Sequence, residues 1–231
     1  MASFPPQLPL ALRYPPDQRF ETYVAVDPPG VAQLRELSAR PRRAGAFVAG
    51  APATGKTHLL LACCAEAEEH GHRAAYLPLA AAAGRLRDAL EALHECALVA
   101  LDGVDALAGN RDDEVALFDF HNRMHDAGRA VVYSARAWPD ALPLVLPDLR
   151  SRLQQCTRVA LHAPDDEGRR ELLRLRARRR GLQFDDAAID WLLRRVDRDV
   201  ASLAALFERL DRASLAAQRR LTVPFLRDVL G

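Results

Sequence analysis

Short apolar runs alternate with helical patterns along the first 161 residues of the chain. Runs typical of strands buried on both faces occur at residues 46–49, 74–77, 97–101, 130–133 and 158–161. Apolar residues with helical spacing lie before or between them, at residues 31–39, 57–69, 84–93 and 113–125. This alternation predicts an α/β fold in which helices cover a parallel sheet.

The pattern becomes entirely helical after residue 161. Helices are predicted at residues 166–180, 185–196, 199–217 and 223–230, with Asp165 or Asp166 capping the first and Gly181 ending it. We therefore expect an α/β base over residues 20–163 and a small all-α lid over residues 164–231. Residues 1–19 hold five prolines and few periodic apolar positions, which predicts an extended tail.

A glycine-containing loop joins the first predicted strand to the following helix. It fits the pattern G-x-x-x-x-G-K-[ST] with Gly50, Ala51, Pro52, Ala53, Thr54, Gly55, Lys56 and Thr57. The glycines let backbone N–H groups face phosphate oxygens, and Lys56 brings a cation to the β and γ phosphates. The Thr57 hydroxyl can ligate Mg²⁺, so the loop predicts a site for ADP or ATP with magnesium.

A second acidic element follows the apolar run at residues 97–101. Asp102 stands at the end of this predicted strand, where ligands collect in open α/β sheets. It is placed to hold Mg²⁺ through water, as in the Walker-B motif. A helix cap or turn aspartate is the alternative, and the phosphate loop favours the metal role.

Composition narrows the class of protein. The formal net charge of +1 predicts neither a strongly basic nucleic-acid binder nor an acidic tail. The four cysteines lack metal-ligand spacing and sit in apolar segments, which favours buried free thiols in a reducing cytosol. The N-terminus lacks the features of a signal peptide, and no apolar run reaches the ~20 residues of a membrane span, so we expect a cytoplasmic protein.

With these motifs, the chain resembles the AAA+ family of the bacterial replication initiator DnaA, and most of all its shorter Hda branch, the regulatory inactivators of DnaA. Residues 19–24, here called the entry segment, resemble the segment that frames the adenine pocket and include Phe20. Residues 146–153 resemble the arginine-finger motif. Residues 182–231, which include residues 210–225, are similar to the Hda lid and form the most specific stretch of the resemblance.

The N-terminal tail carries a second feature of the Hda branch. Gln7, Leu8, Leu10 and Leu12 resemble the peptide that docks into the hydrophobic cleft of the DNA polymerase sliding clamp. Ala11 stands where the usual peptide has proline, which weakens the match. A proline-rich tail without function is the alternative.

Three positions depart from the pattern of a self-sufficient AAA+ ATPase. Gly103 follows Asp102 where a carboxylate would orient the attacking water. Ala135 replaces the sensor 1 aspartate, leaving Ser134 as a poor substitute, and Ala201 replaces the sensor 2 arginine. Losing one transition-state group typically costs ~10²–10³ in rate, so we expect little or no ATPase activity of the chain itself.

The resemblance implies a negative regulator of DNA replication initiation. Arg152 would act in trans as an arginine finger on ATP held by DnaA, with Arg150 as the secondary candidate. The initiator continues into a helix-turn-helix domain where this chain stops, so sequence-specific DNA binding is not expected. A nucleotide-dependent homo-oligomer is compatible with the family, as is either ADP or ATP as the resting ligand.

The sequence is also compatible with other functional hypotheses. An autonomous AAA+ ATPase such as a helicase loader, a small-molecule kinase and a DNA-binding initiator all share the phosphate loop. The arginine-rich stretch at residues 169–180 predicts an amphipathic lid helix with a solvated basic face. Contact of this stretch with DNA or with an acidic partner is the alternative.

Overall fold

The computed structural model describes residue 15 and residues 18–24, 28–195, 200–217 and 219–230 of the chain. Its base is built on a five-stranded sheet in which every strand pair is parallel and the strand order is β2-β3-β4-β1-β5. The strands are β1 (Ala44–Gly50), β2 (Ala74–Pro78), β3 (Leu98–Asp102), β4 (Ala130–Ala135) and β5 (Thr157–Leu161). All five apolar runs are therefore strands, and the predicted α/β fold class is confirmed.

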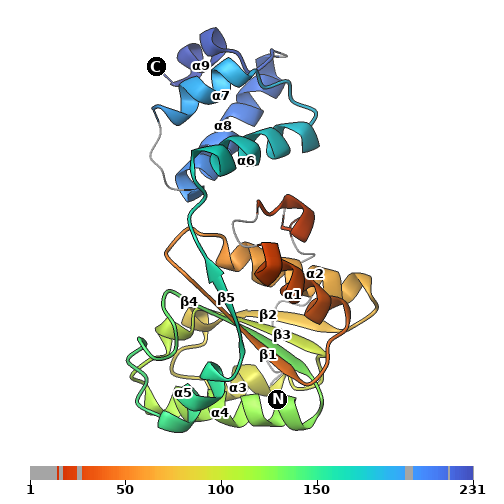
Figure 1. Cartoon of the computed structure of the whole chain (residues 1–231), viewed down its shortest axis with the longest axis vertical. Coiled ribbons are helices and arrows are strands. Elements are labelled where there is room, and N and C mark those ends of the chain that lie inside the picture. The colour runs from red at the N-terminus through yellow and green to blue at the C-terminus, as the bar shows by residue number, and fades with distance from the viewer. Residues whose placement is uncertain (1–14, 16–17, 25–27, 196–199, 218, 231) are drawn as a thin grey trace, which may run out of the picture.

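Helices cover both faces of this sheet (Figure 1). On one face lie α1 (Pro28–Ala39) and α2 (Lys56–Glu69). On the other lie α3 (Leu86–Glu91), α4 (Arg111–Asp126) and α5 (Pro147–Gln154). Three 3₁₀ turns complete the base: η1 (Phe20–Thr22), η2 (Leu79–Ala81) and η3 (Val104–Ala106).

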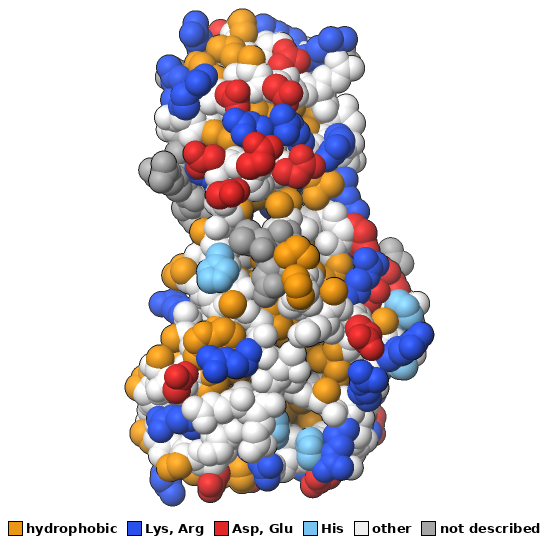
Figure 2. Space-filling model, in the orientation of Figure 1, with side chains coloured by type: hydrophobic (Ala, Val, Ile, Leu, Met, Phe, Trp, Pro, Cys, Tyr) orange, Lys and Arg blue, Asp and Glu red, His pale blue; other side chains and the backbone are white. Residues whose placement is uncertain are grey.

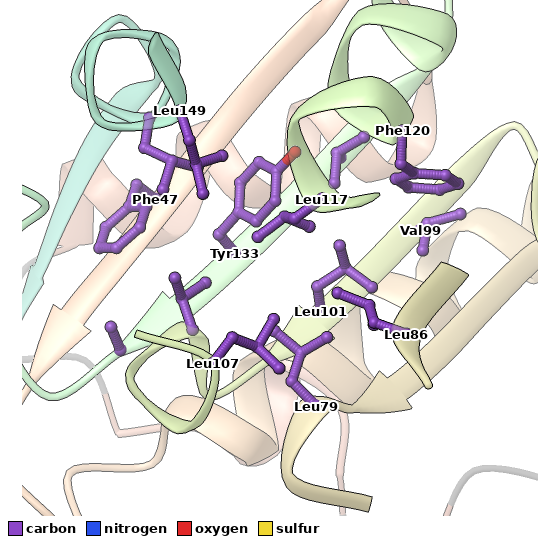
Figure 3. Close-up of a cluster of buried hydrophobic side chains, with 14 of the residues drawn as sticks. Phe47, Leu79, Leu86, Val99, Leu101, Leu107, Leu117, Phe120, Tyr133 and Leu149 are labelled. Carbon is purple, nitrogen blue, oxygen red and sulfur yellow. The ribbon is translucent and has the colours of Figure 1, made fainter. Parts of the chain in front are cut away.

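The strands contribute alternate side chains to two apolar cores. Phe47, Leu101 and Tyr133 pack on the α3–α5 side, as Figure 3 shows. Val48 and Val132 point to the opposite side and pack with α1 and α2. Because side chains alternate along a strand, a sheet buried on both faces requires continuous apolar runs, which is the pattern seen in the sequence.

The remaining helices form the lid, which has its own core. They are α6 (Asp166–Arg179), α7 (Asp186–Leu193), α8 (Val200–Ala217) and α9 (Val223–Leu230). Phe207, Leu221 and Leu226 are among its fully buried side chains. The Asp165 carboxylate caps α6 by accepting from Gly168 N at 2.8 Å.

The lid follows β5 through a short connection and lies beyond the face of the sheet that α1 and α2 cover (Figure 1). The entry segment contacts it, because Val24 packs against the lid core. Among the described residues, no helix is long and apolar enough to cross a membrane.

Candidate functional site

The phosphate loop leaves the carboxyl end of β1 and leads directly into α2. Gly55 is the N-cap of α2 and adopts a left-handed conformation with φ of 93°. Ala53 is also left-handed, with φ of 61°, a conformation that costs a non-glycine residue ~1–2 kcal/mol. Strained conformations of this kind are common at functional sites. Here the two left-handed residues turn the loop over the start of the helix.

Both loop glycines are required by close packing, and Gly55 is also required by its left-handed backbone. A Cβ on Gly50 would lie 2.7 Å from the Leu161 carbonyl oxygen and 2.7 Å from Thr54 Oγ1. A Cβ on Gly55 would lie 2.7 Å from the Tyr23 ring. Any side chain at either position would therefore displace the loop from its neighbours.

Lys56 lies across the loop. Its Nζ donates to the carbonyl oxygens of Gly50 at 2.8 Å and Ala51 at 2.7 Å. Burial lowers the pKa of Lys56, while the carboxylates of Asp102 and Asp105 act in the opposite direction. The ammonium group is thus held inside the loop, where a phosphate would need a cation.

The two residues predicted to hold Mg²⁺ lie together. Thr57 Oγ1 donates to Asp102 Oδ2 at 2.6 Å, although the residues are 45 positions apart in the chain. The hydroxyl comes from the first turn of α2 and the carboxylate from the end of β3. A hydroxyl and a carboxylate are hard oxygen ligands of the kind magnesium prefers.

Two further side chains hold the Asp102 carboxylate, and sequence reasoning missed the first of them. Tyr76 in β2 donates its hydroxyl to Asp102 Oδ2 at 2.8 Å, and Ser134 in β4 donates to Asp102 Oδ1. Burial and the adjacent carboxylate raise the pKa of Tyr76, so its hydroxyl stays protonated and donates. Alternation along the strands could have indicated Tyr76, since Asp102 lies on the same face as Ala100, the residue that pairs with Tyr76 in the sheet.

The backbone after Asp102 explains part of the departure at Gly103. Gly103 has φ of 89° and starts the turn into η3, with its N–H donating to Ser134 O at 3.2 Å. Asp105, the next carboxylate, accepts from Arg136 N at 2.9 Å. Ala135 is fully buried in the core on the α3–α5 side. Gly103 and Ala135 therefore carry no carboxylate that could orient a water molecule, and the carboxylate of Asp105 is already hydrogen-bonded.

The entry segment docks beside the phosphate loop. Phe20 is 6% exposed and packs in the core with α1 and α2. Tyr23 touches the loop itself, because its hydroxyl donates to Thr54 O at 3.2 Å and its ring lies against Gly55. His58, in the first turn of α2, contacts Thr22 Oγ1 at 3.2 Å and joins this segment to the base. Tyr23 was not singled out from the sequence.

The residues present fit a magnesium nucleotide. The loop is curled by left-handed residues, its lysine is held within it, and a hydroxyl–carboxylate pair stands at its end. The helix that begins at Lys56 also directs its positive end at the loop. These are the features that phosphates and Mg²⁺ require.

Arg152 lies at the end of the sheet where the strands begin, opposite the end that carries the phosphate loop. It belongs to α5 and lines a pocket of about 200 Å³ together with Ala44 and Gly45, which begin β1. Since the phosphate loop starts at the other end of this strand, six residues on, the two sites are separated by about 20 Å of strand. Arg150 is held differently, because its Nη2 donates to Leu144 O at 2.6 Å.

Some predicted residues cannot be placed. The proposed clamp-binding residues Gln7, Leu8, Leu10 and Leu12 lie outside the described residues. Ala201 is in the first turn of α8, as bounded here.

The arginine-rich stretch forms α6 and the residue that ends it, and most of its arginines pair with carboxylates within the lid. Arg170 pairs with Asp190 and Arg174 with Asp186, both of α7. Arg180 pairs with Asp211 of α8. Figure 2 shows acidic and basic side chains interspersed over this part of the surface. The helix is amphipathic as predicted, but its basic face is matched by carboxylates.

Comparison with known proteins gives one match to the lid helices and several matches to the fold as a whole. Residues 166–230 match the family model described as the lid domain of Hda. The fold is similar to domain III of the Thermotoga maritima replication initiation protein DnaA, with a TM-score of 0.79 at 22% identity, covering 94% of this chain and 98% of that one.

Two other structures extend the comparison. AMPPCP-bound DnaA from Aquifex aeolicus has a TM-score of 0.68 at 22% identity, over 85% of this chain and 66% of that one. The Thermotoga maritima RuvB Holliday junction branch migration motor has a TM-score of 0.65 at 14% identity, over 92% of this chain and 72% of that one. At these identities the structural likeness establishes the AAA+ fold.

Proposed function

We propose that this chain, a DnaA/Hda-like AAA+ protein, is a negative regulator of replication initiation that stimulates hydrolysis of ATP bound to DnaA. The observation that carries the proposal is the position of Arg152. It lies at the amino edge of the sheet, about 20 Å along β1 from the chain's own phosphate loop. An arginine there is too far away to act on its own nucleotide and is free to meet that of a neighbour.

The chain's own nucleotide has a structural role in this proposal. Lys56 and the loop N–H groups bind the phosphates of ADP or ATP, and Thr57 and Asp102 hold the metal. When bound, Mg²⁺ neutralises phosphate charge. Ligand that binds only the folded protein stabilises it by mass action, and the entry segment, which contacts both loop and lid, shares in that effect.

Slow turnover by the chain itself is the second element. No carboxylate follows Asp102, because Gly103 occupies that position in a left-handed turn. Asp105 is engaged by the backbone N–H of Arg136. Without a group to orient water, the phosphate loop favours retention of nucleotide over its hydrolysis.

Arg152 supplies the activity in trans. A guanidinium placed against the transferring phosphate stabilises transition-state charge and is worth ~10³–10⁵ in rate. Within the described residues, Arg152 forms no ion pair with a carboxylate, so its charge is available to a partner. The tail with Gln7, Leu8, Leu10 and Leu12 would restrict this action to DNA that carries a sliding clamp.

The test is ATP hydrolysis by DnaA, measured with and without this protein and a DNA-loaded clamp. We expect stimulation only in the complete mixture. Arg152→Ala should lower the stimulated rate of hydrolysis by ~10³-fold or more. Deletion of the tail before Arg13 should also abolish the stimulation. Arg178→Ala is the matched control, because Arg178 is an exposed arginine paired with Glu171 in the lid.

Two results would reject the proposal. One is rapid ATP hydrolysis by the isolated chain with no response from DnaA, which would make it an autonomous ATPase such as a helicase loader. The other is equal stimulation by the Arg152→Ala protein and the wild type.

A further inference from the structure

The pocket that contains Arg152 gathers positive side chains from three separate segments. Arg43 precedes β1, Arg129 precedes β4, and Arg152 comes from α5. His121 and His125, one turn apart on α4, and Gln155 also line it. Of the described residues that line the pocket, none is an aspartate or a glutamate.

The three arginines differ from those of the lid helix in their surroundings. Among the described residues, none of the three forms an ion pair with a carboxylate. Arg43 donates to the ring of His125, with Nε 3.0 Å from its Nε2. Asp126, which is exposed, lies 3.5 Å from His125 Nδ1. Three like charges therefore converge on one hollow without compensation.

His121 fits this pocket because it adds no fourth charge. Its Nδ1 lies 2.9 Å from the hydroxyl of the buried Tyr133, and its ring stacks near that of His125 with centroids 6.3 Å apart. Burial, His125 and Arg152 together lower the pKa of His121 to about 4. The ring is thus neutral at pH 7 and lines the pocket without adding charge.

We propose that this pocket binds the terminal phosphates of a di- or triphosphate, with Arg43 and Arg129 holding the anion beside Arg152. Guanidinium groups suit phosphate because they donate in a planar fork that matches its oxygens. Convergence of uncompensated positive charge in a hollow raises the local concentration of multivalent anions. The arginine finger is then one of three cations that form a single phosphate site.

The size of the pocket favours a phosphate end group over a larger ligand. Its volume of about 200 Å³ is below the ~300–1,000 Å³ of typical small-molecule sites. A hollow of this size holds the charged end of a ligand whose remainder lies outside. A nucleic-acid backbone carries one charge per phosphate along an extended path, and three arginines around one hollow match it poorly.

Two sources can supply such an anion. One is the nucleotide in the phosphate loop of a partner AAA+ protein, and this assignment rests on the proposed function of Arg152. The other is a free polyphosphate or nucleotide in solution. The chemistry of binding is the same, and the experiment separates the sources.

The first arm measures binding of sodium tripolyphosphate to the full-length chain by isothermal titration calorimetry. All proteins carry Lys56→Ala, which weakens binding at the chain's own phosphate loop. We expect one saturable site, with Arg43→Gln and Arg129→Gln each weakening it by about ten- to a hundredfold. Arg178→Gln, a charge change in the lid, should leave it unaltered, and circular dichroism verifies that each variant is folded.

The second arm measures stimulation of DnaA hydrolysis by the same arginine variants with Lys56 intact. Loss of both binding and stimulation supports the pocket with the partner's nucleotide as the source. Loss of binding alone supports the pocket with a free polyphosphate as the source.

The inference is overturned if tripolyphosphate shows no saturable site, or if Arg43→Gln and Arg129→Gln bind as tightly as the parent. It is also overturned if Arg178→Gln weakens binding equally, since binding is then non-specific. In these cases the effect of Arg152→Ala on DnaA still decides the proposed function separately.

Discussion

Two groups of arginines in this chain have opposite surroundings. Those of α6 and Arg180 are close together in sequence, and most of them meet carboxylates of the lid, such as Asp190, Asp186 and Asp211. Arg43, Arg129 and Arg152 are far apart in sequence and converge on a pocket that no carboxylate of the described residues lines. The first group is a structural network, and the second is a site for an external anion.

The comparison shows why a run of charge is a weak indicator of function. A helix with many arginines attracts attention in the sequence, but neighbouring helices supply partners that leave it nearly neutral. Isolated arginines attract none, although folding can bring them together without counterions. Lid arginines should therefore affect stability, and pocket arginines should affect binding.

The largest expected effect on stability comes from Arg180. Its guanidinium pairs with Asp211 and with Glu208, whose Oε1 lies 2.6 Å from Nη2. Asp211 is only 8% exposed, so Arg180→Gln leaves a buried carboxylate without its cation. We expect a loss of about 3 kcal/mol in the free energy of unfolding, measured by urea denaturation.

The control for this prediction is Arg178→Gln. Arg178 is 65% exposed and pairs with Glu171, so its removal should cost no more than ~0.5 kcal/mol. If the two substitutions cost the same, the lid network does not depend on its buried carboxylate.

The next effect is the pH dependence that His121 contributes. Its pKa falls from 6.5 to about 4 on folding, so the unfolded chain binds a proton first as the medium becomes acidic. Its contribution is complete above pH 6.5 and is lost between pH 6.5 and 4, with an expected loss of about 2 kcal/mol after allowing for partial exposure.

Urea denaturation at pH 7 and pH 4 measures this contribution. His121→Gln keeps a polar partner for Tyr133 and should remove that part of the stability loss. An identical pH dependence in the variant and the wild type would show that the pocket does not hold His121 neutral.

The smallest effect is expected for the pocket arginines. Arg129 forms no ion pair with a carboxylate among the described residues, so Arg129→Gln relieves like-charge repulsion without breaking a pair. The free energy of unfolding should change by less than ~0.5 kcal/mol, toward greater stability. Thermal unfolding at low ionic strength measures the change, and a loss above ~1 kcal/mol would mean that Arg129 is a structural residue like Arg180.

Much of the nucleotide site could be predicted because its parts are local. The eight residues of the phosphate loop are consecutive, and the glycines and lysine have fixed places in that short segment. Asp102 was recognisable because it ends an apolar strand. The approach of Thr57 to Asp102 followed from the rule that ligands gather at the carboxyl edge of a parallel sheet.

The supports around that site were less accessible to sequence reasoning. Tyr76 reaches Asp102 only because β2 lies next to β3, and a strand order cannot be read from one strand's residues. Tyr23 reaches the loop only because the entry segment docks on α2 through His58. In both cases the contact depends on packing between segments distant in the chain.

The sequence by itself determined the α/β base, the helical lid and the phosphate loop, because these depend on periodicity and on residues close together in the chain. Only the tertiary structure decided which charges are compensated. It placed carboxylates of α7 and α8 against arginines of α6 and Arg180, whereas none of the described carboxylates lines the pocket of Arg43, Arg129 and Arg152. Electrostatic interactions act through space, so the balance of charge at a site is a property of the packed fold.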